Sequence, residues 1–245
     1  MRIAALAFAA AAVIISGCRD TSGIRGYWSS HTPDITDYAA AEEEFADFAQ
    51  LALQAPEADA FAAVDMLLNK ARKDEVTYLV YTDLIARAFA TISSPCYSCA
   101  IFTHAADKIL RQDLLSDFAA EEYSLRREFC LHNRVGDRAE IPLMNDGVQA
   151  EIPFETRTLF LVVDQDCPSC RESMRHFTSA KWDSTARVAL CYGVGPLPND
   201  GIWQCRRISP DQGIIDTRQA PFFFVTAPGG TVEITYTSVY NEQYL

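Results

Sequence analysis

An apolar run that breaks into a cysteine-containing turn constrains the fold of this chain more than any other feature. Leu159–Val163 contains no polar residue and ends in two valines, which is typical of a strand buried on both faces. The run stops at Asp164, and a Cys-Pro-Ser-Cys motif follows at Cys167–Cys170. Pro168 has the backbone angle that is favoured in the first turn of a helix. The sequence therefore predicts a strand, a turn and a helix, in that order.

The two cysteines of this motif predict thiol–disulfide chemistry. Unpaired N–H groups and the positive end of the helix dipole stabilise a thiolate at a helix N-terminus. Cys167 is the outer sulfur and is expected to attack a disulfide, and Cys170, one turn further on, is expected to displace the mixed disulfide. A structural disulfide and half of a zinc site are the alternatives for such a pair. The strand-turn-helix context favours a redox-active disulfide.

The first residues are typical of an export signal. Arg2 is followed by thirteen apolar residues, Ile3–Ile15, and then by Ser-Gly-Cys. The run is short for a membrane span, and Ile15–Cys18 resembles the bacterial lipobox. The resemblance implies that a signal peptide, residues 1–17, is cleaved and that a lipid is attached to Cys18. The protein would then lie in the cell envelope, either at the periplasmic side of the inner or outer membrane or at the cell surface. The alternative is a soluble secreted protein.

Charge and cysteine content narrow the classes of partner. The net charge of −12 argues against nucleic acid and against an anionic membrane surface as partners, because both would repel the chain.

Export places the remaining seven cysteines in an oxidising compartment, where disulfides persist. We expect Cys191 and Cys205, which lie outside any CxxC motif, to form a structural disulfide that closes a Gly- and Pro-rich loop.

Residues 18–32 read as a tether, with Tyr27 and Trp28 able to dock on the domain that follows. Residues 33–134 show apolar residues at helical spacing and predict an all-helical domain. Its fourth helix is expected from Cys96 to about Phe118, and its fifth to end at Gly136.

That fourth helix would begin with a second CxxC motif, Cys96 to Cys99, with Ser94 as its cap and Pro95 in its first turn. We favour a structural role for this pair, as a disulfide, as thiols or through pairing with Cys130. An electron relay to Cys167 and Cys170 and a metal site are the alternatives.

Residues 135–245 show the shorter period of strands and predict an α/β domain. Strands are expected at 148–152, 158–163 and 187–191, and a helix at 169–180. The segment 193–218 is rich in Gly, Pro and Asp and reads mostly as loop. A hairpin is expected from strands at 222–225 and 231–236, with Pro-Gly-Gly at its turn. The fold class is thus a two-domain α+β chain, in which a helical domain precedes an α/β domain.

The order of motifs in the second half resembles thioredoxin-fold proteins. It runs from residues 133–139 and Gly147 through the Cys-Pro-Ser-Cys turn to Ala220-Pro221, a strand, a glycine turn and a last strand. The region is most similar to the TlpA/ResA-type membrane-tethered oxidoreductases. The helical half is similar to a domain of unknown function that precedes such modules in bacterial lipoproteins. Tyr27-Trp28 and Ser94-Pro95 carry this likeness. The resemblance implies that Pro221 is cis, faces the CxxC motif and, with Ala220, orients the substrate chain as an added strand.

The chain departs from that pattern at three places. Asp166 replaces the aromatic residue that commonly precedes the first cysteine, and its charge is expected to raise the pKa of Cys167. Leu161 matches the buried acid of thioredoxin, so the sequence names no proton acceptor for Cys170. Only nine residues follow Tyr236, too few for the usual closing helix, and part of the sheet therefore needs another cover.

Together these features predict a lipid-anchored thiol–disulfide oxidoreductase without cofactor or resident metal. The resemblance implies a reductase that acts on disulfides of exported proteins and receives electrons from a membrane donor. A non-catalytic interaction module with structural disulfides is the main alternative. Thiol peroxidase activity and copper delivery are further alternatives, although the activating Arg-Thr pattern and a suitably placed histidine are both missing from the sequence.

Overall fold

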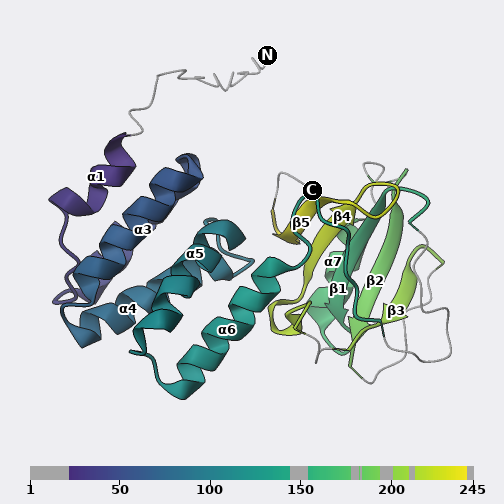
Figure 1. Cartoon of the computed structure of the whole chain (residues 1–245). Coiled ribbons are helices and arrows are strands. Elements are labelled where there is room, and N and C mark those ends of the chain that lie inside the picture. Colours follow the sequence, from purple (N-terminus) through teal and green to yellow (C-terminus); the bar gives the residue numbers. More distant parts are fainter. Residues whose placement is uncertain are drawn as a thin grey trace, which may run out of the picture.

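The computed structural model describes residues 22–143, 154–177, 182, 184–193, 201–209 and 213–241. The expected signal peptide, the lipidation site Cys18 and the strand at 148–152 lie outside these residues. The chain is a mixture of helix and sheet, with the helices α1 to α6 preceding all strands (Figure 1). Residues 22–131 are called the helical region below, and residues 154–241 the sheet region. None of the described helices combines the length and apolar character that a bilayer span requires.

Six α-helices build the described part of the helical region, and side-chain caps fix where several of them begin. Asp37, Asp74, Ser98 and Ser116 each accept a hydrogen bond from a backbone N–H of the first turn. The helices are α1 (Ser22–Ser30), α2 (Tyr38–Gln54), α3 (Glu57–Ala71), α4 (Glu75–Ile85), α5 (Cys99–Ile109) and α6 (Asp117–Leu131). A π-helical turn, Ala86–Ala90, extends α4.

The expected tether is largely helix. α1 packs against α2 and α3, and the Trp28 side chain is fully buried among Phe48 and Tyr81. The docking of Trp28 on the domain that follows is confirmed, and residues 22–30 of the expected tether form a helix. Burying a tryptophan stabilises the helix that carries it, which outweighs the Gly- and Ser-rich composition of this segment.

The second CxxC motif opens its helix in a different way from the one expected. Ser98, and not Ser94, caps α5, and Cys99 is its first residue, whereas Cys96 lies in the preceding turn. Ser94 accepts a hydrogen bond from the N–H of Cys96 within that turn. α5 ends at Ile109, so the long helix expected to reach Phe118 is two helices, with a left-handed residue, Asp113, between them.

Cys99 does not pair with Cys96 but forms a disulfide with Cys130. The bond joins the start of α5 to the end of α6, across a sequence separation of 31 residues. A loop of this length corresponds to about 3.5 kcal/mol in the chain-entropy model of disulfide stabilisation. Cys96 is a buried thiol. The structural role favoured from the sequence thus takes the form of pairing with Cys130.

In the described part of the sheet region, five strands form one sheet in the order β3-β2-β1-β4-β5. β2 and β3 run parallel to β1, whereas β4 is antiparallel to it and forms a hairpin with β5. The bounds are β1 (Thr158–Asp164), α7 (Pro168–His176), β2 (Ala186–Tyr192), β3 (Gln204–Arg207), β4 (Phe222–Thr226) and β5 (Val232–Ser238). The expected strands at β1 and β2 and the hairpin are confirmed. β3 lies in the segment that was expected to be mostly loop.

The two faces of the sheet have different covers. Leu161, Val163 and the other residues of one face pack with α7. The alternate residues, among them Phe160 and Val162, belong to a core that continues without a break into the helical region. The helical region meets the sheet beside β5 (Figure 1), where the ring of Phe129 in α6 stacks on Tyr236 at 4.3 Å. The helices therefore reach the face opposite α7.

Extended segments complete the cover of that face. Ala139, Ile141 and Leu143 from the connection after α6, together with Phe154 and Ile214, pack against the same core. Asn133 fixes the connection, because its side-chain amide binds both the carbonyl oxygen of Glu140 and the hydroxyl of Tyr236. These segments and the end of α6 together cover the face of the sheet opposite α7.

Candidate active site

The Cys-Pro-Ser-Cys motif lies where the predicted strand-turn-helix unit placed it. β1 ends at Asp164, Cys167 occupies the N-cap position of α7, and Pro168 is the first helical residue. Because α7 packs on the sheet through its buried residues Cys170 and Met174, its N-terminus stands at the carboxyl end of β1. In the structure, both cysteines of the motif are thiols.

Cys167 has the environment of a stabilised thiolate. Its sulfur lies 2.8 Å from the hydroxyl oxygen of Ser169 and is partly exposed. Hydrogen bonds from the Ser169 hydroxyl and, next in importance, from the backbone N–H of Cys170 lower the pKa of the Cys167 thiol. A lowered pKa increases the thiolate fraction at neutral pH, which is the form that attacks disulfides.

Cys170 has the opposite environment. Only 1% of the residue is exposed, and burial raises the pKa of its thiol to about 12. The backbone N–H of Asp164 donates to its sulfur at 3.4 Å and partly offsets this effect, whereas the negative charge of Asp164 adds to it. The pair therefore combines an accessible, acidic thiol with a protected, protonated one.

We expect these environments to separate the two cysteines in a pH-dependent alkylation experiment. Since the pKa of Cys167 is below its ordinary value of 9.0 and that of Cys170 is about 12, iodoacetamide should modify Cys167 first at every pH below 12. The Ser169→Ala variant loses the largest cause of the lowered pKa, so the midpoint of Cys167 modification should move to higher pH. Peptide mass spectrometry measures both rates. Faster modification of Cys170 would overturn the assignment of roles.

Ala220 and Pro221 lie beside the carboxyl end of β1. The bond between them is cis, as the resemblance implied. Phe222 is paired with Val162 in the register of β4 and β1, so Pro221 stands level with the last residues of β1, just before the cysteine turn. Ala220 follows a 3-10 turn, Thr217–Gln219, that contacts β1.

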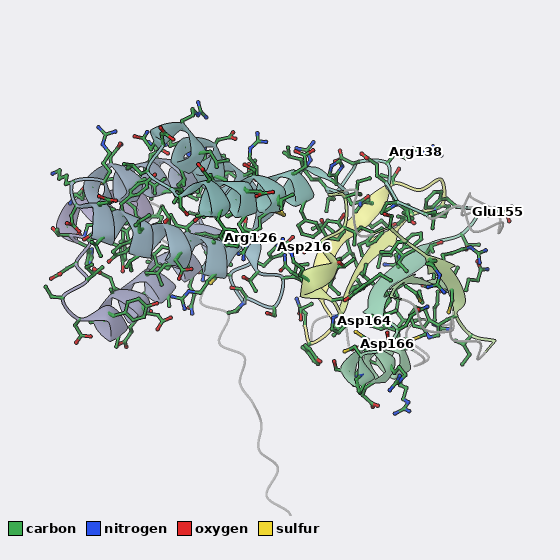
Figure 2. The ribbon with its side chains drawn as sticks, turned by 90° about the horizontal axis from the view of Figure 1, so that it is seen from below. Arg126, Arg138, Glu155, Asp164, Asp166 and Asp216 are labelled. Atoms are coloured by element: carbon green, nitrogen blue, oxygen red, sulfur yellow. A yellow bond between two sulfur atoms is a disulfide. The ribbon has the colours of Figure 1, made fainter. Side chains whose placement is uncertain are left out.

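The 3-10 turn Thr217–Gln219 is held from two sides. The Tyr192 hydroxyl, at the end of β2, donates to the carbonyl oxygen of Thr217 at 2.8 Å. From the helical region, the N–H of Ile92 donates to the side-chain oxygen of Gln219 at 2.7 Å, and Glu122 accepts from Arg218 at 2.8 Å. Figure 2 shows Asp216 at this junction, whereas Asp164 and Asp166 lie near α7. The helical region thus helps to position the segment that leads into Pro221.

The polar residues around the motif differ from expectation in two ways. Asp166 is exposed and is not among the main causes of the shift of Cys167, and the pKa of the Cys167 thiol is lowered in spite of this nearby charge. Leu161 is buried and apolar, as expected, but Asp164 provides the carboxylate whose charge Cys170 senses. The sequence signal for Asp164 was its place at the end of the strand, three residues before Cys167.

Cys191 and Cys205 do not form the disulfide expected from the sequence. They lie on the neighbouring strands β2 and β3, but Cys205 is in register with Ala189 and Cys191 with Arg207. Diagonal positions on adjacent strands have Cα atoms about 7–8 Å apart, at or beyond the limit for a disulfide. The two thiols still interact, and this hydrogen bond, followed by burial, raises the pKa of Cys191.

The second CxxC motif is separated from the first by the sheet. Cys96 belongs to the core that includes the helical region, whereas Cys170 belongs to the core on the α7 face. An electron relay rests on the premise that the helical region takes the place of the missing closing helix against the sheet and so brings the two pairs together. The structure gives that premise no support, because the helices reach the face opposite α7. Among the described residues, no three His, Cys, Asp or Glu side chains gather as a metal site.

No protein-family model matches the chain, and no curated protein is similar to it in sequence. Among solved structures, the chain is similar to the crystal structure of a thioredoxin-like protein from Bacteroides caccae ATCC 43185. The TM-score is 0.73 at 14% sequence identity, and the match covers 97% of this chain and 96% of the other. At this identity the likeness establishes the fold and not the activity. The chain has a thioredoxin-like fold.

Proposed function

We propose that this chain is a membrane-tethered thiol–disulfide oxidoreductase that reduces disulfides of exported proteins. The observation that carries the proposal is the contrast within the Cys-Pro-Ser-Cys motif: the pKa of the accessible Cys167 is lowered and that of the buried Cys170 is raised to about 12. An attacking thiol needs the first property. A resolving thiol gains from the second, because it stays protonated until a mixed disulfide forms beside it.

The reaction then proceeds in two exchanges. The Cys167 thiolate attacks one sulfur of the substrate disulfide, the substrate S–S bond breaks, and one substrate sulfur leaves as a thiolate. Cys170 then attacks the sulfur of Cys167, the mixed disulfide breaks, and the proton of Cys170 goes to the second substrate sulfur, which leaves as a thiol. The substrate gains two electrons and one proton from the protein, its other thiolate takes a proton from solvent, and Cys167 and Cys170 end as a disulfide. A membrane electron donor restores the dithiol.

Two measurements on the purified protein test this function. With dithiothreitol as electron source, the protein should reduce insulin catalytically, and the Cys167–Cys170 couple should have a reduction potential above about −300 mV, the region of catalytic disulfides. A potential below that value together with no turnover would favour the alternative of a structural disulfide in an interaction module.

The anchor is the second part of the proposal. It rests on the likeness of Ile15–Cys18 to a lipobox and on the short apolar run before it. Metabolic labelling with palmitate should mark the protein in its cell envelope. A Cys18→Ser variant that still takes up the label would contradict lipidation at this residue.

A further inference from the structure

A cavity of about 570 Å³ lies between the helical region and the sheet region. One wall is the turn segment 92–97, which connects the π-helical turn after α4 to α5. The other wall is the second half of β5 and the residues after it, 235–241. β5 is the edge strand of the sheet and faces the helical region (Figure 1). The cavity is lined by residues of this strand. It is called the edge groove below.

The edge groove opens at the same end of the sheet as the Cys-Pro-Ser-Cys motif. Ser238, in its wall, is paired with Phe222, the residue after Pro221, and Phe222 is paired with Val162 near the end of β1. Two strand spacings, about 10 Å, separate β5 from β1. Three to four residues of extended polypeptide cover that distance. A chain whose disulfide lies at Cys167 therefore reaches the groove within a few residues.

The walls of the edge groove are also tied to the segment before Pro221. Ile92, in the first wall, donates its N–H to the Gln219 side chain at 2.7 Å, and Gln219 directly precedes Ala220. The hydrogen bond of Ile92 with Gln219 thus connects the groove wall to the 3-10 turn Thr217–Gln219. A polypeptide bound in the groove lies next to the segment on which the proposed reaction depends.

The chemistry of the edge groove fits a polypeptide backbone. Of the described residues that line it, none is charged, although the whole chain has a net charge of −12. Most of them offer a hydroxyl or an amide, among them Ser93, Thr237 and Asn241, and Tyr240 adds a ring that is 62% exposed. Hydroxyl and amide groups bind backbone N–H and C=O groups of any sequence. An edge strand also accepts an extended chain as an additional strand.

We propose that the edge groove binds the extended polypeptide that flanks the target disulfide of a substrate protein. The helical region is then one wall of the substrate site and favours protein disulfides over small ones. This inference rests on the proposed function, since it concerns the substrate of the same cysteines.

Two variants test the edge groove. Ser93→Trp fills it from an exposed position in the helical region, and Tyr240→Ala removes an exposed ring from the other wall. The measured quantity is the ratio of kcat/KM for insulin to kcat/KM for 5,5′-dithiobis(2-nitrobenzoate). Each variant should lower this ratio about tenfold, the effect of one or two lost hydrogen bonds or an equivalent contact. A ratio equal to that of the unmodified protein in both variants overturns the inference.

A matched control and a second measurement separate this inference from the proposed function. Ser124→Trp introduces the same side chain at an exposed serine of α6, outside the groove, and should keep the ratio. If the unmodified protein reduces neither substrate, the proposed function fails, and hydrogen exchange decides about the groove. Reduced, carboxymethylated insulin B chain should then slow exchange at 92–97 and 235–241. No change in exchange at these segments would overturn the inference.

Discussion

The Cys167→Ser variant is expected to reduce no disulfides above the uncatalysed rate. A serine hydroxyl stays protonated at neutral pH and does not attack disulfides, so the hydrogen bonds that lower the pKa of the Cys167 thiol have no thiolate left to stabilise. The measurement is turnover of insulin with dithiothreitol as reductant. Cys205→Ser is the matched control, because Cys205 is also a thiol of the sheet region but lies on β3, two strands away from β1. It should keep its turnover.

The Cys170→Ser variant should fail at a later step. Its Cys167 still attacks, but no second thiol displaces the mixed disulfide, so one equivalent of substrate should stay bound to each protein molecule. Non-reducing electrophoresis and mass spectrometry detect this product. If Cys167→Ser also traps substrate, another cysteine is the nucleophile. Cys170, which that variant keeps, would then be the residue to examine.

The strand-turn-helix unit could be predicted because its signals are local. A continuous apolar strand, a proline in the first helical turn and cysteines on either side of that proline are all within twelve residues. The cis bond at Pro221 was expected only through the resemblance to thioredoxin-fold proteins, since isolated X-Pro bonds are mostly trans. The roles of Cys167 and Cys170 followed from their positions in the helix, and the structure supplies the physical causes: a hydroxyl beside one thiol and burial of the other.

The elements that sequence reasoning missed depend on contacts between distant residues. β3 has the sequence Gln-Cys-Arg-Arg, which shows no apolar alternation, and it is a strand because β2 offers a free edge in the right register. The disulfide of Cys99 with Cys130 depends on how α5 and α6 lie side by side. The sequence analysis left pairing with Cys130 open and could not choose it. Local spacing instead favoured a bond within a CxxC motif or across a loop.

Local sequence signals also could not predict the junction of the helical and sheet regions. Phe129 is the central residue of that junction. The helical spacing of apolar residues in 33–134 predicts a core formed among the helices alone. In the structure the Phe129 ring packs against Tyr236 and Phe222 of the sheet, at centroid distances of 4.3 Å and 6.1 Å. The same core extends from the helices to one face of the sheet, so the two regions share apolar contacts that neither could keep if the other unfolded. We therefore expect them to unfold together.

The Phe129→Ala variant tests this shared core. Truncation of a fully buried phenylalanine removes apolar contacts and leaves a cavity, which should lower the free energy of unfolding by about 3–5 kcal/mol. Phe118→Ala is the matched control: it is the same change in the same helix, but Phe118 is 75% exposed, and its effect should stay within about 0.5 kcal/mol. Denaturant titrations followed by circular dichroism report mainly on the helices, and fluorescence of Trp182 and Trp203, measured in a Trp28→Phe background, reports on the sheet region. Coincident transitions in the unmodified protein, both moved to lower denaturant by Phe129→Ala, are the expected result. If the helical signal alone moves, the helices and the sheet are independent units, and the contacts of Phe129 with Tyr236 and Phe222 do not couple them.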